Sequence, residues 1–249
     1  MRKIVIITIS LTLLFPFWVE AQGIKYTDQQ DHYSFSVPKG WTEIPKEQIE
    51  QLEQNVQKQF GGKGQVIDYK TGFQPKSHKR IRPPHIIVQV QKHKSINTPS
   101  YSQIKEILQN KKPIRKLEGK SNLSELLSNA EINEPIIDKE RNIVLTNMET
   151  NLKNGKKLKM MMVMFLGKKN ITQLNFYSLK SEYSKNLPIF KKVIDSFKYE
   201  QGYKYNLEQA KKNDPPSIFE GMTEAGIKGL IGGVLLALVG GLVYKSKSK

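Results

Sequence analysis

Alternating apolar and polar residues predict several β-strands in the first part of the chain. The segment 33–37 alternates in this way, and a Pro-Lys-Gly turn and Trp41 follow it. Residues 65–73 and 86–91 show further strand patterns, because successive side chains on a strand point to opposite faces of its sheet. We therefore expect strands at these three places.

Apolar residues at spacings of three and four predict three amphipathic helices. The first covers 45–60 and ends at a Gly-Gly pair, which is typical of a helix C-terminus. The second covers 101–117, with Pro113 as a break or kink. The third has Asn186 as its N-terminal cap and Pro188 in its first turn, and its apolar face extends to residue 197.

Three consecutive strands are predicted between the second and third helices. They cover about 136–152, where the start is irregular, then 158–166 and 171–179. Asn154 and Gly155 indicate a β-hairpin between the first two strands, because this pair favours the positive φ angles of a tight turn. The order of the elements predicts the α+β class, with an antiparallel sheet covered by helices.

Two short motifs in this region resemble the PsbP-like domains of exported bacterial proteins. One is similar to the opening strand and turn of those domains and reads Tyr33-x-Phe35-x-Val37-Pro38-x-Gly40-Trp41. The other is similar to their closing helix and spans 193–197. The resemblance covers residues 24–200 and includes the order of the elements. It implies an α/β/α sandwich, and a role as a binding or accessory module without catalytic residues.

The first 21 residues have the pattern of a secretory signal peptide. Arg2 and Lys3 form a basic start, an apolar run follows, and Val19 and Ala21 occupy the −3 and −1 positions of a cleavage site. We expect cleavage after Ala21, so that the mature chain begins at residue 22. An uncleaved N-terminal anchor is the alternative.

A second apolar segment lies near the end of the sequence. Residues 229–244 form an unbroken run of 16 uncharged residues. As a helix this run is about 24 Å long, and the flanking Lys228 and Lys245 can extend their ammonium groups to the lipid headgroups. We therefore predict one transmembrane helix over 225–244. A buried helix of the preceding domain is the alternative.

The charges beside this helix predict its orientation. Three lysines in the basic tail 245–249 favour the cytoplasmic side. The main domain is then expected on the outer side of the cell membrane, periplasmic or extracellular, in a single-pass protein. The predicted organisation is a signal peptide over 1–21, the PsbP-like domain over 22–200, a polar tether over 201–216, a juxtamembrane helix over 217–224, the transmembrane helix and the tail.

Small residues recur at every fourth position along the two predicted C-terminal helices. Such a ridge lets two helix backbones approach closely in a membrane. It consists of Gly221, Ala225, Gly229, Gly233, Ala237 and Gly241. The ridge predicts association with a second copy of the chain or with another membrane helix. The alternative is that glycine and alanine are simply common in such helices.

The chain is strongly basic. Its 249 residues include 40 Lys and Arg against 23 Asp and Glu, which gives a formal net charge of +17. Cations are dense just before Pro83-Pro84, at Lys76, Lys79, Arg80 and Arg82. These four residues are the candidate contact site for an anionic lipid or an envelope polyanion. The expected outward location disfavours nucleic acid as a partner, and a solvated basic surface without a partner is the alternative.

The sequence predicts no catalytic residues, no cofactor and no metal site. The chain has no cysteine, which excludes a disulfide framework and thiolate metal ligands. Met160, Met162 and Met164 are expected to share one buried face of a strand rather than to bind copper. We therefore expect a membrane-anchored, outward-facing binding or accessory module. The alternative function is an oligomeric membrane component that assembles through the small-residue ridge.

Overall fold

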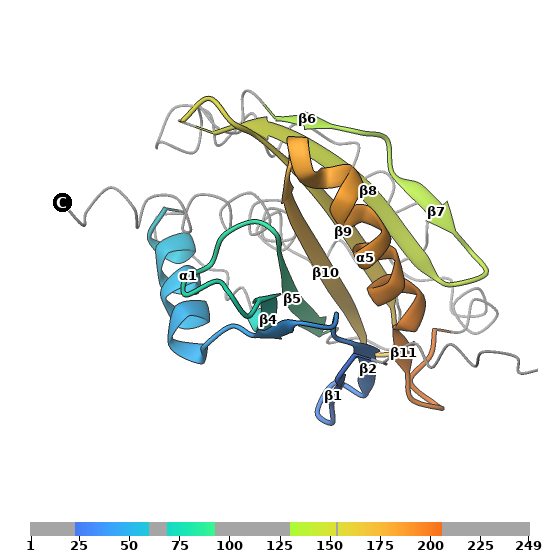
Figure 1. Cartoon of the computed structure of the whole chain (residues 1–249). Coiled ribbons are helices and arrows are strands. Elements are labelled where there is room, and N and C mark those ends of the chain that lie inside the picture. The colour runs from blue at the N-terminus through green and yellow to red at the C-terminus, as the bar shows by residue number, and fades with distance from the viewer. Residues whose placement is uncertain (1–22, 60–68, 93–129, 153, 206–249) are drawn as a thin grey trace, which may run out of the picture.

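A computed structural model describes residues 23–59, 69–92, 130–152 and 154–205. These residues form two antiparallel sheets and two α-helices (Figure 1). Seven strands of the larger sheet follow the order β3-β4-β5-β10-β9-β8-β6, and an eighth, β7, also pairs with β8. The seven strands, in that order, are Trp41–Glu43, Tyr69–Pro75, His85–Lys92, Asn170–Leu179, Lys157–Leu166, Ile143–Asn151 and Glu131–Ile132.

The smaller sheet joins the two ends of the described domain. β1 (Lys25–Asp28) and β2 (Tyr33–Ser36) form a hairpin, and β11 (Lys198–Tyr199) pairs with β2 from the other end of the domain sequence. The two sheets are linked at the start of β10. There Asn170 Nδ2 donates a hydrogen bond of 3.1 Å to Asp31 O.

The central strands of the larger sheet are buried along almost their whole length. Nine of the ten residues of β10 are buried, so this strand shows no alternation in exposure. On β9, Met161 lies opposite Phe176 of β10, whereas Met160 lies opposite Tyr177 and therefore on the other face. All four methionines from 160 to 164 are at most 4% exposed, which confirms that they are part of the core.

The two helices pack against different parts of the larger sheet. α5 (Tyr183–Ser196) crosses β8 and β9 in Figure 1, and its Phe190 ring centroid lies 5.0 Å from that of Phe176. α1 (Lys46–Gln59) lies beside β4, where Glu53 Oε1 accepts a hydrogen bond of 2.7 Å from Tyr69 N–H. The expected α+β class is confirmed for the described residues. The predicted helix over 101–117 lies outside them.

One predicted strand is a hairpin in the structure. The prediction of a single strand over 136–152 is wrong, because β7 (Ile136–Asp138) turns back and pairs with the start of β8. Asp138 Oδ1 accepts hydrogen bonds from the N–H groups of Glu140 and Arg141, at 3.1 and 3.0 Å. Asn142 then adopts a φ of 56°, a left-handed conformation that asparagine tolerates better than most residues. The irregular start noted in the sequence is this turn.

The last helix begins earlier than predicted. A 3₁₀ turn (Lys180–Glu182) leads directly into α5 at Tyr183, so Asn186 is not its cap and Pro188 lies inside the helix. Asn186 is buried instead, and its Nδ2 donates a hydrogen bond of 2.9 Å to Ser178 Oγ on β10. The amide thus attaches the helix to the sheet.

The described ranges contain no helix that is long and apolar enough to cross a membrane. The predicted signal peptide, the juxtamembrane and transmembrane helices and the basic tail all lie outside these ranges, so they stay predictions. The first residues of the predicted tether differ from expectation. Residues 201–205 fold back on the domain, and Tyr205 is only 6% exposed.

Candidate functional site

The predicted basic loop is an ordered connection between β4 and β5. Lys76, Lys79, Arg80 and Arg82 are all exposed on it. Three hydrogen bonds fix its backbone: Lys76 N–H to Gly40 O, Gln48 Nε2 to Lys79 O and Gln74 Nε2 to His78 O, at 2.9, 3.3 and 3.2 Å. The structure therefore brings the four predicted contact residues together on one supported loop.

The segment that contains this loop carries charge of one sign. Residues 69–92, which span β4, the loop and β5, carry six Lys and Arg and no Asp or Glu. Among the described residues, no ion pair joins Lys76, Lys79 or Arg82 to a carboxylate. Lys156 precedes β9 and Lys157 begins it, at the same end of the sheet, since β5, β10 and β9 are antiparallel neighbours. Cations therefore gather at this end of the sheet, where Glu149 also pairs with Lys159 and Lys180.

Two histidines near the loop add no charge at neutral pH. Burial, followed by the nearby Arg82, lowers the pKa of His78 below its usual value. Burial also lowers the pKa of His85 to about 3, and its ring stacks on Tyr177 with 4.4 Å between the centroids. His85 is therefore a core residue, and it is only 3% exposed.

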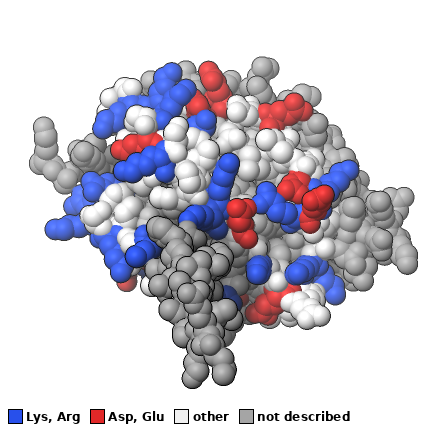
Figure 2. All heavy atoms as spheres, turned by 45° about the vertical axis from the view of Figure 1, so that its right-hand side comes forward, with Lys and Arg blue, Asp and Glu red and all other residues white. Residues whose placement is uncertain are grey.

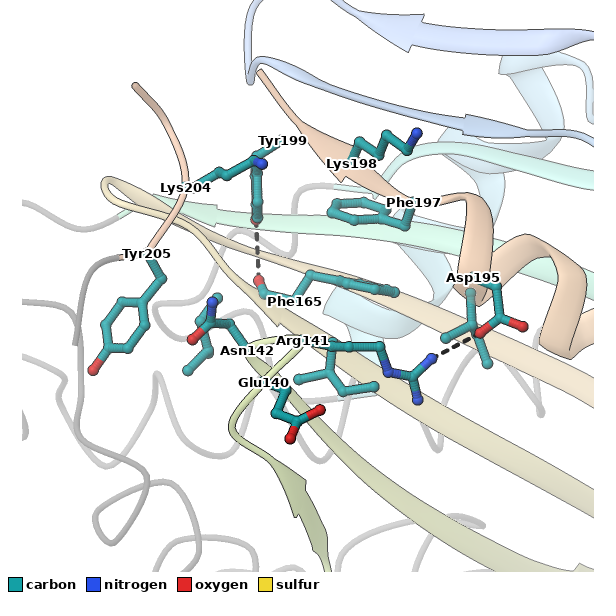
Figure 3. Close-up of a pocket in the computed structure, with 13 residues that line it drawn as sticks. Glu140, Arg141, Asn142, Phe165, Asp195, Phe197, Lys198, Tyr199, Lys204 and Tyr205 are labelled. Atoms are coloured by element: carbon teal, nitrogen blue, oxygen red, sulfur yellow. Dashed lines mark hydrogen bonds and ion pairs between the residues drawn. The ribbon is translucent and has the colours of Figure 1, made fainter. Parts of the chain in front are cut away.

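A different feature, which the sequence did not reveal, lies at the opposite end of the larger sheet. Here a cavity of about 310 Å³ opens between the β7–β8 turn, the end of β9, the end of α5, β11 and residues 204–205 (Figure 3). Its lining comes from five separate places in the chain. No local motif could therefore have predicted it.

Aromatic side chains form much of the cavity wall. The rings of Phe165 and Phe197 stack with their centroids 3.7 Å apart and their planes 18° apart. Tyr199 projects its hydroxyl toward Phe165 O, at 3.0 Å, and lies 2.9 Å from Thr172 Oγ1 (Figure 3). Burial raises the pKa of Tyr199, so its hydroxyl stays protonated. This side of the cavity is apolar and fixed in position.

Charged groups form the opposite wall. Arg141 Nε donates to Asp138 Oδ2 at 2.8 Å, and Arg141 Nη1 donates to Asp195 Oδ1 at 2.7 Å. The hydrogen bonds from Arg141 lower the pKa of Asp138. Arg141 thus connects the β7–β8 turn to the end of α5, and its charge is compensated by both carboxylates.

The cavity is completed by residues 200–205, here called the strap. Lys168 N–H donates to Tyr203 O at 2.8 Å, and Glu200 N–H donates to His32 O at 2.9 Å. The His32 ring stacks on Tyr203 at 3.6 Å, and its Nδ1 lies 2.9 Å from Glu200 Oε2. These contacts hold the strap against the domain.

Acidic and basic side chains are mixed on the face beside the strap. In Figure 2, which brings the right-hand side of Figure 1 forward, acidic groups lie among the Lys and Arg side chains. In the described ranges, no three His, Asp or Glu side chains are grouped to hold a metal ion. The ridge residues Gly221, Ala225, Gly229, Gly233, Ala237 and Gly241 lie outside these ranges.

No protein-family model matches the chain, and no curated protein matches it. Several solved structures are similar in fold. The solution structure of cyanobacterial PsbP (CyanoP) from Synechocystis sp. PCC 6803 has 12% identity and a TM-score of 0.43, and the match covers 71% of this chain and 91% of that protein.

Two further structures are similar to a lesser degree. LpqN of Mycobacterium tuberculosis, which is described as involved in cell envelope biogenesis, has 13% identity and a TM-score of 0.36 over 70% of this chain and 88% of that one. A protein of Bacteroides thetaiotaomicron VPI-5482 has 12% identity and a TM-score of 0.38 over 91% and 80%. The similar structures thus include a member of the PsbP group, which the sequence motifs resemble. The three TM-scores are all below 0.5.

Proposed function

We propose that this chain is a membrane-anchored, extracytoplasmic binding module without catalysis, and that its loop between β4 and β5 binds a polyanion of the cell envelope. The observation that carries the proposal is the set of four exposed cations on that loop, within a segment that has no acidic residue. Clustered cations on a fixed backbone attract a polyanion through many weak contacts, because each contact releases counterions.

The position of the loop favours a polymer over the lipid bilayer. The strap lies at the cavity end of the sheet, and the chain continues from there toward the predicted transmembrane helix. The loop lies at the other end of β5, whose eight residues span about 26 Å at roughly 3.3 Å per residue. The cations are therefore separated by about the length of the sheet from residue 205, the last residue that the structure describes.

The proposal can be tested with the full chain in nanodiscs of phosphatidylcholine, which carry no net charge. Long-chain polyphosphate serves as the probe, and its binding is measured by interferometry at several salt concentrations. The double variant Lys76→Gln, Lys79→Gln should weaken binding about tenfold, or ~1.4 kcal/mol. It should also make binding less sensitive to salt, because fewer counterions are released.

The matched control is Lys25→Gln, Lys191→Gln, which removes the same charge from two exposed lysines on β1 and α5. The proposal requires this control to bind polyphosphate like the unmodified chain. Equal losses in both variants would mean that only net charge matters. If the chain bound phosphatidylglycerol vesicles but not polyphosphate, its ligand would be an anionic membrane surface rather than a polymer, and the proposal would be overturned.

A further inference from the structure

We propose that residues 93–129, which connect β5 to β6, dock on the face of the larger sheet opposite α5. In this arrangement the helix predicted over 101–117 lies across β10, β9 and β8 and supplies hydrogen-bond partners to a buried cluster of amide side chains. The proposal is independent of the polyanion site, because it involves none of the cations on the loop between β4 and β5.

The side of the sheet opposite α5, here called the second face, is buried beyond the reach of the described helices. α5 and the smaller sheet complete the core on the first face, and α1 lies beside β4 (Figure 1). Yet on the second face Met162 and Met164 of β9 are 4% and 1% exposed. Thr146 and Val144, which lie opposite them on β8, are 3% and 0% exposed. Chain outside the described ranges must therefore cover this part of the sheet.

The strand order identifies which part of the chain does so. β5 ends at Lys92, beside the start of β10, whereas β6 begins at Glu131, opposite Glu149 and at the other end of the sheet. β10, β9 and β8 lie between β5 and β6, so these two strands are about 19 Å apart at roughly 4.8 Å per spacing. Residues 93–129 therefore have to cross the sheet. A helix over 101–117 would be about 25 Å long, which suits such a crossing.

Two observations place this crossing on the second face. The first face is already occupied by α5 and the smaller sheet. In addition, β5 and β6 run in the same direction, because every pairing between them is antiparallel, and connections between parallel strands of one sheet are right-handed in about 98% of cases. In Figure 1, α5 lies in front of the sheet, β5 runs toward β11, and the edge with β6 and β7 lies to the upper right. A right-handed connection then passes behind the sheet.

A cluster of amides on the second face indicates what the docked segment contacts. Gln89 on β5 lies opposite Gln173 on β10, and Gln173 Nε2 donates a hydrogen bond of 2.8 Å to Asn175 Oδ1. Gln89 Oε1, Gln173 Oε1 and Asn175 Nδ2 are buried and have no hydrogen-bond partner among the described residues. Buried polar groups in native proteins are nearly always paired. Residues 101–117 offer partners, because uncharged polar side chains such as Gln103 flank their apolar positions.

Photo-methionine, a diazirine analogue close in shape to methionine, tests the docking in the full chain in phosphatidylcholine nanodiscs. The second face carries four methionines, namely Met148, Met160, Met162 and Met164. Met161 is on the first face, where its Sδ lies 3.8 Å from the Tyr183 hydroxyl of α5. After irradiation, residue-resolved mass spectrometry should link the second-face methionines to residues within 93–129. The link from Met161 to α5 is the internal control.

Two other patterns of cross-links would overturn the proposal. One is a link from Met162 or Met164 to residues 206–249, or to a second copy of the chain in a mixture of isotope-labelled and unlabelled protein. The other is the absence of links to 93–129 in a sample that shows the link from Met161 to α5.

Oxidation by hydrogen peroxide gives a second measurement, because it requires access to the methionine sulfur. The variant Ile104→Asp, Leu108→Asp places two charges on the apolar side of the predicted helix. It should raise the rate of sulfoxide formation at Met162 and Met164 about tenfold, with Met161 unchanged as the reference.

The matched control is Ser102→Asp, Gln109→Asp, which places two new carboxylates on the other side of the predicted helix. It should leave the oxidation of the second-face methionines unchanged. If the Ile104→Asp, Leu108→Asp variant oxidised no faster than this control, residues 101–117 would not cover the second face.

Discussion

The hydroxyl of Tyr199 connects three strands through a single buried oxygen. The residue is 8% exposed and belongs to β11. Its hydroxyl contacts Phe165 O on β9 and both Thr172 N–H and Thr172 Oγ1 on β10. A buried polar group that loses its hydrogen-bond partner lowers the stability of the folded protein, because that group stays out of contact with water. Tyr199 therefore contributes to stability beyond the area that its ring buries.

We expect Tyr199→Phe to lower the free energy of unfolding by about 1–3 kcal/mol, since it leaves the Thr172 and Phe165 groups without this partner. Proteolysis of the full chain in detergent across a urea series measures the change. Tyr203→Phe is the matched control, because this half-buried strap residue keeps its stack on His32. If the Tyr199→Phe variant were as stable as the Tyr203→Phe control, the Tyr199 hydroxyl would not contribute to stability as proposed.

His85 makes stability depend on pH. Burial lowers its pKa to about 3, whereas an unfolded histidine titrates near 6.5. The folded state therefore excludes a proton that the unfolded state binds. Stability is lost as the pH falls below about 6.5, and the loss continues until about pH 3. At pH 5 it amounts to about 2 kcal/mol.

The variant His85→Gln should reduce the difference in unfolding free energy between pH 7 and pH 5 by about this amount. The same urea series at the two pH values measures it. His32→Gln is the comparison, because His32 lies beside the carboxylate of Glu200 and not in the core. If the His85→Gln variant lost as much stability between pH 7 and pH 5 as the unmodified chain, burial of His85 would not be the cause of that loss.

At the scale of elements, some of the structure follows from local patterns and some does not. Alternation correctly predicted two strands, since 33–37 corresponds to β2 and 86–91 to β5. The Asn154-Gly155 pair correctly predicted the turn between β8 and β9, where Gly155 has a φ of 76°. β7 was missed, because its turn depends on the Asp138 side chain rather than on glycine or proline. The start of α5 was also missed, because Asn186 resembles a cap but is used for tertiary packing.

The small-residue ridge is an element-scale prediction that the described residues leave untested. If the ridge packs against a second helix, replacing Gly229, Gly233 and Gly241 by Leu should abolish oligomers of the full chain, because leucine keeps the backbones apart. Cross-linking in native membranes, followed by size analysis, measures this. Replacement of Val234, Val239 and Val243 by Leu is the control, and it should leave the oligomers intact. If the ridge variant still formed oligomers, the alternative function of an oligomeric membrane component that assembles through this ridge would be excluded.

At the scale of the whole molecule, the larger sheet separates two features of different chemistry. The loop with Lys76 and Lys79 extends from one end, and the cavity with Phe165 and Tyr199 lies at the other. The loop was predictable, because its four cations lie within seven consecutive residues, 76–82. The cavity was not, because its walls come from segments that are brought together only by folding. Charge density is thus a local property of a sequence, whereas a cavity is a property of the fold.

The order of strands also determines when the domain can fold. β5 pairs with β10, so that Gln89 meets Gln173, and β2 pairs with β11, so that Ser34 meets Lys198. β2 and β5 therefore each lack one of their two neighbouring strands until most of the domain sequence is present. Pairings between such distant residues form slowly. During synthesis from the N-terminus, the early strands can form only their local hairpins, β1–β2 and β4–β5. The smaller sheet is complete only when residues 198–199 have also been synthesised.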